Sequence, residues 1–185
     1  MGNFLLFIVL LFFLFFIFLS SLFFLLGWRD SFFLKIPFVS TRKRAIDLII
    51  KALSLSKESL VYEPGCGSAH VLKAAVISAP GAKGIGTEKG YLPYIFSRIN
   101  TFGLPISILY GDMLSPDFSQ FTHIYCYLRG TLMEDFSQKI LDECKKGTRI
   151  VSCDFTFPNI PLVQTISLEA GHDKLSRVLY IYEIK

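Results

Sequence analysis

The chain has 185 residues, of which 52% are hydrophobic, and a formal net charge of +4. This length suffices for one domain with its own core and is too short for two comfortable ones. Five basic residues and one acidic residue lie between Arg29 and Arg44, and the rest of the chain balances to zero. Because the excess charge forms one short cluster, a nucleic-acid-binding surface is not expected.

Residues 4–26 form an apolar run, "FLLFIVLLFFLFFIFLSSLFFLL", which only Ser20 and Ser21 interrupt. As a helix this run extends about 34 Å, against a hydrocarbon core of roughly 30 Å. A cleaved signal peptide, the alternative, has a basic start and a shorter apolar run, whereas the first four residues, "MGNF", carry no charge. We predict an uncleaved transmembrane anchor over residues 1–28.

The basic cluster follows this run, in a segment that mixes aromatic and charged residues, and Pro37 argues against a continuous helix into the next domain. Positive charge beside a span stays on the cytoplasmic side and is attracted to anionic lipid headgroups. We therefore expect a basic linker over residues 29–40. The protein is predicted to cross the membrane once, with the lipid bilayer as a partner and its C-terminal domain on the cytoplasmic side.

The remaining segment, residues 41–185, begins with a predicted helix to about Leu53 and then alternates between short apolar runs and helix-like segments. This alternation favours a mostly parallel α/β sheet covered on both faces. Two runs near the C-terminus are joined too closely to be parallel, which predicts an antiparallel hairpin. The expected strands are 59–64, 82–88, 106–112, 122–128 and 149–155, and the helices between them are 68–79, 91–102 and 131–145, with one short turn at 113–121.

The segment "VYEPGCGSAH" follows the first expected strand, where open α/β sheets bind ligands. Gly65 and Gly67 allow the backbone to approach a ligand, and Glu88, at the end of the second strand, suits a pair of ribose hydroxyls. An NAD-binding turn would need glycine at His70, and the GK[ST] of a phosphate-binding loop is absent. Because Glu63 precedes the turn, a cationic ligand is indicated. An amino-acid end plus a ribose describes S-adenosylmethionine.

These residues resemble the first motif of the class I S-adenosylmethionine-dependent methyltransferases, an acid followed by x-G-x-G-x-G, except that Ala69 replaces the last glycine. The resemblance implies a Rossmann-like fold. It also implies backbone contacts to the cofactor from the loop centred on Cys66. Asp112, with help from the Met113 backbone, is expected at the adenine edge, although a simple turn-forming role for Asp112 stays open.

A narrower resemblance links "FVST", "CYLRGTLM", "GTRIVSCDFTFP" and "LYIYE" to small membrane-anchored protein-lysine methyltransferases. Their group includes enzymes that act on the adenine nucleotide translocase and on the ATP synthase c subunit. The resemblance implies that Tyr127 is a wall or hydrogen-bond partner for the substrate amine, with an aromatic residue of the strand core as the alternative. It also implies that Ser40 and Thr41 contact the cofactor, although a plain helix cap stays open. Asp154 is a candidate to receive a cationic amine, with a purely structural role as the alternative.

The chain departs from this group where Ser68, Ala69 and His70 replace an acidic residue, Gly and Arg. The function predicted is N-methylation of lysine on a membrane protein. The alternatives are a small-molecule or lipid methyltransferase at the membrane, and a degenerate binding module without activity. The four cysteines form no CxxC pair and have no histidine at zinc spacing, so we expect reduced core residues and no metal.

Overall fold

The structure, a computed structural model, describes residues 2–34, 43–128, 132–168 and 178–185. The chain divides into two compact units, Met1–Pro37 and Phe38–Lys185. The first unit contains one long helix, and the second contains a seven-stranded sheet with its covering helices.

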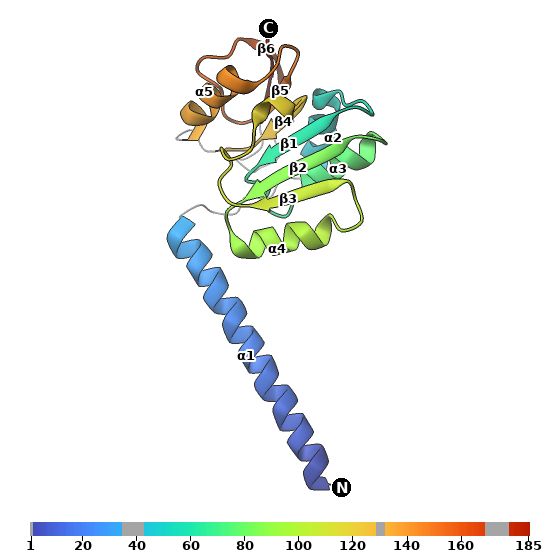
Figure 1. Ribbon diagram of the computed structural model, residues 1–185, viewed down its shortest axis with the longest axis vertical. Coiled ribbons are helices and arrows are strands. Elements are labelled where there is room, and N and C mark those ends of the chain that lie inside the picture. The colour runs from blue at the N-terminus through green and yellow to red at the C-terminus, as the bar shows by residue number, and fades with distance from the viewer. Residues whose placement is uncertain (1, 35–42, 129–131, 169–177) are drawn as a thin grey trace. The chain divides into compact units, whose positions relative to one another are not determined.

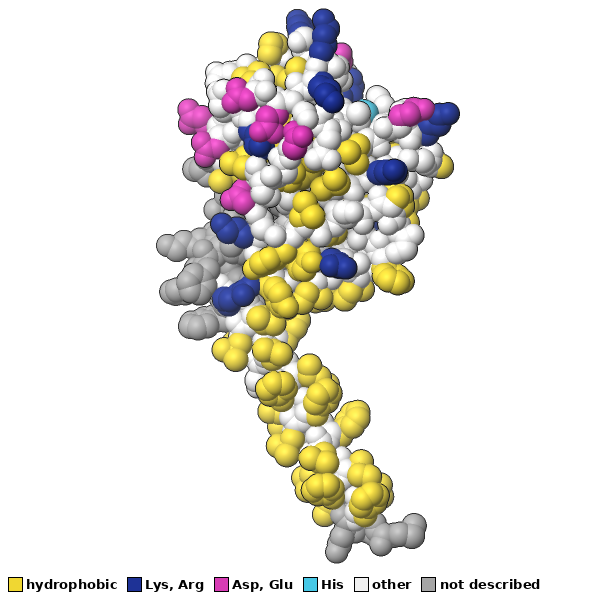
Figure 2. Space-filling model, viewed as in Figure 1, with side chains coloured by type: hydrophobic (Ala, Val, Ile, Leu, Met, Phe, Trp, Pro, Cys, Tyr) yellow, Lys and Arg dark blue, Asp and Glu magenta, His cyan; other side chains and the backbone are white. Residues whose placement is uncertain are grey.

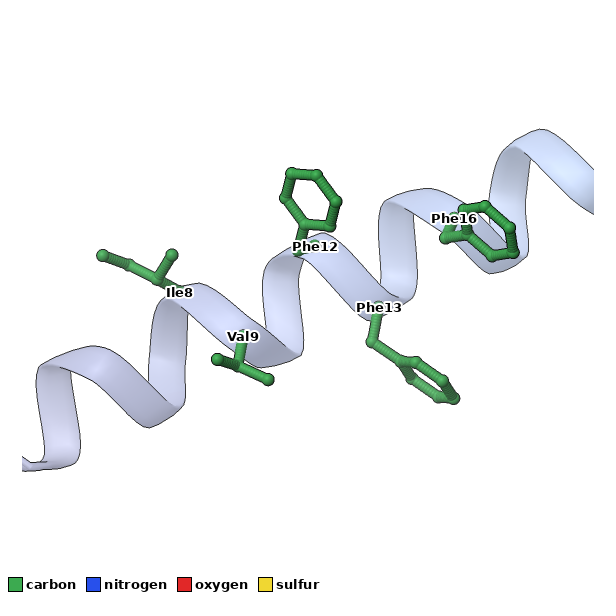
Figure 3. Close-up of a pocket in the computed structure, with 5 residues that line it drawn as sticks. All are labelled: Ile8, Val9, Phe12, Phe13 and Phe16. Carbon is green, nitrogen blue, oxygen red and sulfur yellow. The ribbon is translucent and has the colours of Figure 1, made fainter.

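Helix α1 (Gly2–Leu34) contains an apolar stretch of 24 residues, Phe4–Gly27, with a mean hydropathy of 3.1 and no buried residue in its most apolar window. Its side chains project from more than one side of the helix, and the shallow hollow between them is purely hydrocarbon, lined by Ile8, Val9, Phe12, Phe13 and Phe16 (Figure 3). The helix is long and apolar enough to cross a membrane. It continues to Leu34, six residues into the expected linker, and the sidedness of the anchor stays a prediction.

The second unit is built on a sheet in the order β3-β2-β1-β4-β5-β7-β6 (Figure 1). The first five strands run parallel, and β7 pairs antiparallel with both β5 and β6. This confirms the mostly parallel sheet that ends in an antiparallel hairpin, although the turn of the hairpin lies outside the described residues. The strands are β1 (Leu60–Pro64), β2 (Lys83–Glu88), β3 (Ile106–Tyr110), β4 (His123–Cys126), β5 (Arg149–Cys153), β6 (Leu162–Ser167) and β7 (Val178–Glu183).

Helices lie between the strands as the alternation predicts, and most of their ends are one or two residues shorter than expected. The helix before the first strand is confirmed as well. The short link after β3 contains a single 3-10 turn, η1 (Phe118–Gln120). The helices are α2 (Lys43–Leu53), α3 (His70–Ser78), α4 (Tyr91–Asn100) and α5 (Met133–Glu143).

Adjacent residues of the central strands face opposite sides of the sheet, as the period of two requires. Ile124 and Ile150 belong to an apolar cluster with residues of η1 and α5. Tyr125 and Val151 belong to a second cluster with residues of α2 and α3. Both faces of the central sheet are therefore covered, which explains why these strands are apolar throughout.

Strand β2 contains a glycine that permits close packing beneath the turn after β1. A methyl group added at Gly86 would lie 2.8 Å from the Cys66 sulfur and 3.0 Å from Ile108 Cδ1. Cys66 and Ile108 are themselves buried, in one apolar cluster. The absence of a side chain at Gly86 thus sets how closely the turn after β1 approaches the sheet.

We predict that Gly86→Ala lowers the free energy of unfolding by about 1–3 kcal/mol, since it overpacks this contact. Cys66→Ala in the same chain removes the sulfur and relieves part of the cost. Denaturation of both single variants and the double variant gives the coupling between the two sites. Additive effects would show that the two side chains do not compete for the same space.

Candidate active site

The carboxyl ends of β1 to β5 meet at one edge of the sheet, because these strands run parallel. Each strand end carries a residue that the sequence singles out. These are Glu63 in β1, Glu88 in β2, Asp112 after β3, Tyr127 after β4 and Asp154 after β5. The structure therefore brings the described candidates to the edge where open α/β sheets bind ligands.

The turn after β1 has left-handed backbone at every second residue. The φ angles are 59° at Gly65, 55° at Gly67 and 58° at Ala69. Between them, the Cys66 amide donates to Thr87 O over 2.9 Å, which extends the pairing of β1 with β2 by one residue. The side chain of Cys66 is buried, in agreement with a packing role.

Ala69 adopts the conformation that the third glycine of the motif favours. A left-handed conformation costs an L-residue roughly 1–2 kcal/mol. The Ala69 methyl group is fully buried in the cluster that contains Cys66 and Leu72, and burial of such a group contributes about 0.8 kcal/mol. The departure at position 69 therefore keeps the shape of the turn at a small net cost.

Glu88 connects the end of β2 to this turn. Its Oε2 accepts a hydrogen bond from the Gly67 amide at 2.8 Å, and its Oε1 accepts one from the Gly90 amide at 2.7 Å. Each carboxylate oxygen can accept a second hydrogen bond. Glu88 is thus held in place with acceptor capacity left for a pair of hydroxyls, and its predicted ribose contact stays a prediction.

Glu63 is a buried acid directly before the turn. Its Oε2 accepts a hydrogen bond from the Leu72 amide, in the first turn of α3, at 2.9 Å. Burial raises the pKa of Glu63 to about 8, the Leu72 amide opposes that rise, and the charge of Glu88 adds to it. A cation bound beside Glu63 would favour its ionised form and lower its pKa.

Asp112 lies in a turn, and its Oδ1 accepts a hydrogen bond from the Leu114 amide at 2.8 Å. The turn-forming role is therefore present, and the adenine contact stays a prediction. The next residue, Met113, is held through its carbonyl oxygen, to which the Tyr62 hydroxyl donates at 2.6 Å. The same hydroxyl lies 2.8 Å from Thr87 Oγ1. Tyr62 thus ties the loop after β3 to the ends of β1 and β2.

Tyr127 and Asp154 form a hydrogen-bonded pair, in which the Tyr127 hydroxyl donates to Asp154 Oδ2 at 3.0 Å. Asp154 has left-handed backbone, with φ of 62°. The Asp154 amide donates to Val178 O at 2.9 Å, and Asp154 Oδ1 accepts from the Val178 amide at 3.1 Å. The start of β7 therefore orients the carboxylate. The structure joins these two predicted catalytic residues, and their roles stay predictions.

Asn100, at the end of α4, is a residue that the sequence reasoning missed. Its Nδ2 donates to Ser68 O at 2.8 Å and lies 3.2 Å from His70 Nδ1. Lys73 Nζ in turn donates to Asn100 O at 2.8 Å and to Asn100 Oδ1 at 3.0 Å. Asn100 therefore braces the segment in which the chain departs from its relatives. No motif marks it, because it lies about thirty residues further along the chain.

Some predictions fall on other parts of the chain. Thr41 and Ser40 lie outside the described residues. Within the described part of the chain, Cys66, Cys126, Cys144 and Cys153 form no disulfide, and all but Cys144 are buried. Among residues 2–34, 43–128, 132–168 and 178–185, no group of three His, Cys, Asp or Glu side chains is arranged to hold a metal ion.

The residues at this edge fit S-adenosylmethionine. Glu63 supplies a buried carboxyl group that a bound cation would bring to its ionised form. Glu88 supplies an oriented carboxylate for vicinal hydroxyls. The space beside Gly65 is open, because even an added methyl group there would approach no closer than 3.8 Å to Leu128. A ligand with an ammonium group and a ribose is the chemistry that this donor and acceptor set accommodates.

We predict that Glu63 makes stability depend on pH. Its native pKa of about 8 lies above the ordinary 4.5, so the native protein keeps a proton that the unfolded chain has lost. The free energy of unfolding therefore falls as pH rises from about 4.5 to about 8. Each pKa unit corresponds to about 1.4 kcal/mol, and Glu63→Gln should remove a few kcal/mol of this decline. Unfolding of both proteins, followed by near-UV circular dichroism across this range, measures the difference. Parallel curves would contradict the assignment.

Comparisons with known proteins identify the family of this chain. The profile of the family described as "ANTKMT methyltransferase domain" matches residues 63–164. A protein-lysine N-methyltransferase of Saccharolobus islandicus is 25% identical over 153 residues, which cover 80% of this chain and 94% of that protein.

Two solved structures share the fold. An RNA methyltransferase from Salinibacter ruber, in complex with S-adenosyl-L-homocysteine, has a TM-score of 0.71 and 23% identity and covers 79% of this chain and 94% of its own. The Bacillus subtilis tRNA methyltransferase TrmK has a TM-score of 0.63 and 17% identity and covers 80% of this chain and 68% of its own. With the family match across the glycine turn and the strand ends, the predicted resemblance is confirmed: the chain belongs to the ANTKMT methyltransferase domain family, within the class I S-adenosylmethionine-dependent methyltransferases.

Proposed function

We propose that the protein transfers the methyl group of S-adenosylmethionine to a lysine side chain of a membrane protein. The observation that carries the proposal is the hydrogen bond between Tyr127 and Asp154 at the ligand-binding edge. It places a carboxylate and a phenol together at the ends of β4 and β5, two and three strands away from the Glu88 end of β2. A carboxylate and a phenolic oxygen are suitable partners for a cationic amine. The related protein-lysine N-methyltransferase supports the choice of lysine.

Methyl transfer to nitrogen requires an unprotonated amine that is aligned with the methyl donor. S-Adenosylmethionine supplies an electrophilic methyl group on a sulfonium, so that an N–C bond forms while an S–C bond breaks. A lysine amine has an ordinary pKa of about 10.4 and must first lose its proton, which passes to solvent water. Placement of the amine in a partly desolvated site beside a cation favours the neutral form.

Asp154 and Tyr127 orient the lysine in this proposal. The Asp154 carboxylate receives the arriving ammonium group, and the Tyr127 oxygen accepts a hydrogen bond from the amine once it is neutral. Because β7 already holds Asp154 through Val178, little reorganisation is needed when the substrate arrives. Alignment and electrostatics then supply the rate enhancement.

The apolar helix α1 supports a membrane-embedded acceptor. The apolar stretch of 24 residues precedes the catalytic unit in the sequence. As a membrane span it would keep that unit at the membrane surface. Tethering of this kind raises the effective concentration of a membrane-bound substrate without any new contact. The same anchor would also suit a lipid acceptor, and the experiment below separates the two.

Membranes that contain the full chain are incubated with S-adenosylmethionine labelled in its methyl group. We expect the label to run with a protein on a gel and to be retained on lysine after hydrolysis. Asp154→Asn should lower the rate about 10–100-fold, because a hydrogen bond to a charged group contributes about 1.5–3 kcal/mol. Asp142→Asn, an exposed acid in the last turn of α5, is the matched control. Label in the lipid extract alone would refute lysine methylation.

Asn100→Ala should raise the KM for S-adenosylmethionine about 10-fold, since two hydrogen bonds to the turn are lost at roughly 0.5–1.5 kcal/mol each. The kcat at saturating cofactor should change little, because Asn100 positions the turn and does not touch the reacting atoms. Gln120→Ala removes an exposed amide from η1 and serves as the control. A fall in kcat with an unchanged KM would contradict this positioning role.

A further inference from the structure

Exposed apolar side chains lie on β3, the strand at one edge of the sheet, and on the neighbouring helix α4. Ile99 is 68% exposed, Phe102 is 91% exposed and Tyr110 is 53% exposed, and Leu109 on β3 is exposed as well. We call Ile99, Phe102 and Tyr110 the α4 patch, since Leu109 points to the face of the sheet away from α4. Figure 2 shows hydrophobic side chains over the part of this face where α4 lies. Soluble monomers rarely expose contiguous apolar surface of this kind unless a partner covers it.

The short link after β3 explains part of this exposure. Strand β3 ends the sheet and pairs only with β2 among the described strands. Ile108 faces the buried cluster beside Cys66, whereas Leu109 points to the opposite face of the sheet. The link from β3 to β4 contains only η1 and supplies no full helix to cover that face. The sheet edge is thus left apolar by the topology.

The segment that contains the α4 patch carries only positive charge between two flanking acids, Glu88 and Asp112. The segment from Lys89 to Gly111 contains no Asp or Glu, and its two charged residues are Lys89 and Arg98. Arg98 lies beside the patch on α4, where its guanidinium donates to the Tyr94 hydroxyl at 3.1 Å and sits 5.9 Å from the centre of that ring. Apolar side chains interleaved with cations and tyrosines are the composition of surfaces that bind the headgroup region of anionic membranes.

We propose that the α4 patch rests on the surface of a lipid bilayer. The inference rests on α1 being a membrane span, as the proposed function does, and is independent of the methyl acceptor. Leu34 and Lys43 are nine residues apart in the sequence, so chain connectivity alone keeps the start of α2 within about 30 Å of the end of α1. The bilayer is therefore within reach of the domain.

A second copy of the chain is a poorer occupant of the α4 patch. A two-fold interface brings the same surface of both copies together. It would face Lys89 and Arg98 with their own counterparts, and the segment between Lys89 and Gly111 contains no acid to pair with them. Anionic headgroups, in contrast, are attracted to both cations.

Docking of the α4 patch has a consequence for the substrate. Strand β4 lies three positions from β3 in the sheet. Because neighbouring strands are about 4.8 Å apart, the end of β4 lies about 14 Å from the docked edge. The headgroup layer occupies only several ångströms on each side of the hydrocarbon core. The acceptor lysine then lies at or just above the headgroups and not within the hydrocarbon.

Tryptophan fluorescence in the full chain tests the docking. The single native tryptophan is removed with Trp28→Phe, and Phe102→Trp places the fluorophore in the α4 patch. The control is Val163→Trp, because Val163 is also exposed and apolar but lies on β6, the opposite edge of the sheet. Both proteins are reconstituted in vesicles of phosphatidylcholine and phosphatidylglycerol with brominated acyl chains.

We expect the brominated lipid to reduce emission from position 102 and to leave emission from position 163 unchanged. Equal quenching at both positions, or quenching at neither, would overturn the proposal. Flotation of the vesicles after an alkaline wash reports on the anchor separately. Protein that floats with the vesicles but shows no quenching at position 102 refutes docking of the α4 patch alone. Protein that does not float refutes the membrane span as well. A change in the tryptophan emission from position 102 that depends on protein concentration in detergent would instead indicate contact with a second copy of the chain. That result would also overturn the proposal.

Discussion

The Gly67 amide donates to the Glu88 carboxylate over 2.8 Å, and this contact joins the turn after β1 to the end of β2. The turn depends on it, because left-handed residues at alternate positions leave few backbone groups in regular pairing. The same carboxylate accepts from Gly90 and so also sets where α4 begins. One acid thereby positions the turn, the strand end and the following helix around the space that a cofactor must enter.

Burial of Glu63 gives this edge its electrostatic character. A carboxyl group out of water prefers to keep its proton unless a cation compensates the charge. The positive end of a ligand beside Glu63 would therefore lower this raised pKa and favour the ionised carboxylate. At the other end, Tyr127 and Asp154 form a second polar pair that β7 holds in place. The sheet edge thus carries two acidic positions, of which the proposed function assigns one to the cofactor and the other to the amine.

Much of this arrangement follows from the sequence. The strand–helix alternation predicted the parallel sheet and its hairpin, and parallel strands necessarily bring Glu63, Glu88 and Asp154 to one edge. The contacts of Asn100 and of the Tyr62 hydroxyl were not predictable, because they join residues distant in the chain through side chains that carry no motif. Ala69 is instructive in another way: local preference disfavours its left-handed backbone, and burial of its methyl group compensates. The departure that suggested a degenerate module thus leaves the shape of the turn intact.

The central claim is that the turn and the two glutamates bind S-adenosylmethionine, and calorimetric titration of the full chain tests it most directly. Saturable heat should appear with S-adenosylmethionine or with its demethylated product. Glu88→Gln should weaken binding at least about 10-fold, since a charged acceptor contributes about 1.5–3 kcal/mol. Circular dichroism of the same sample confirms that the protein is folded. No heat from folded protein at millimolar ligand would contradict the account.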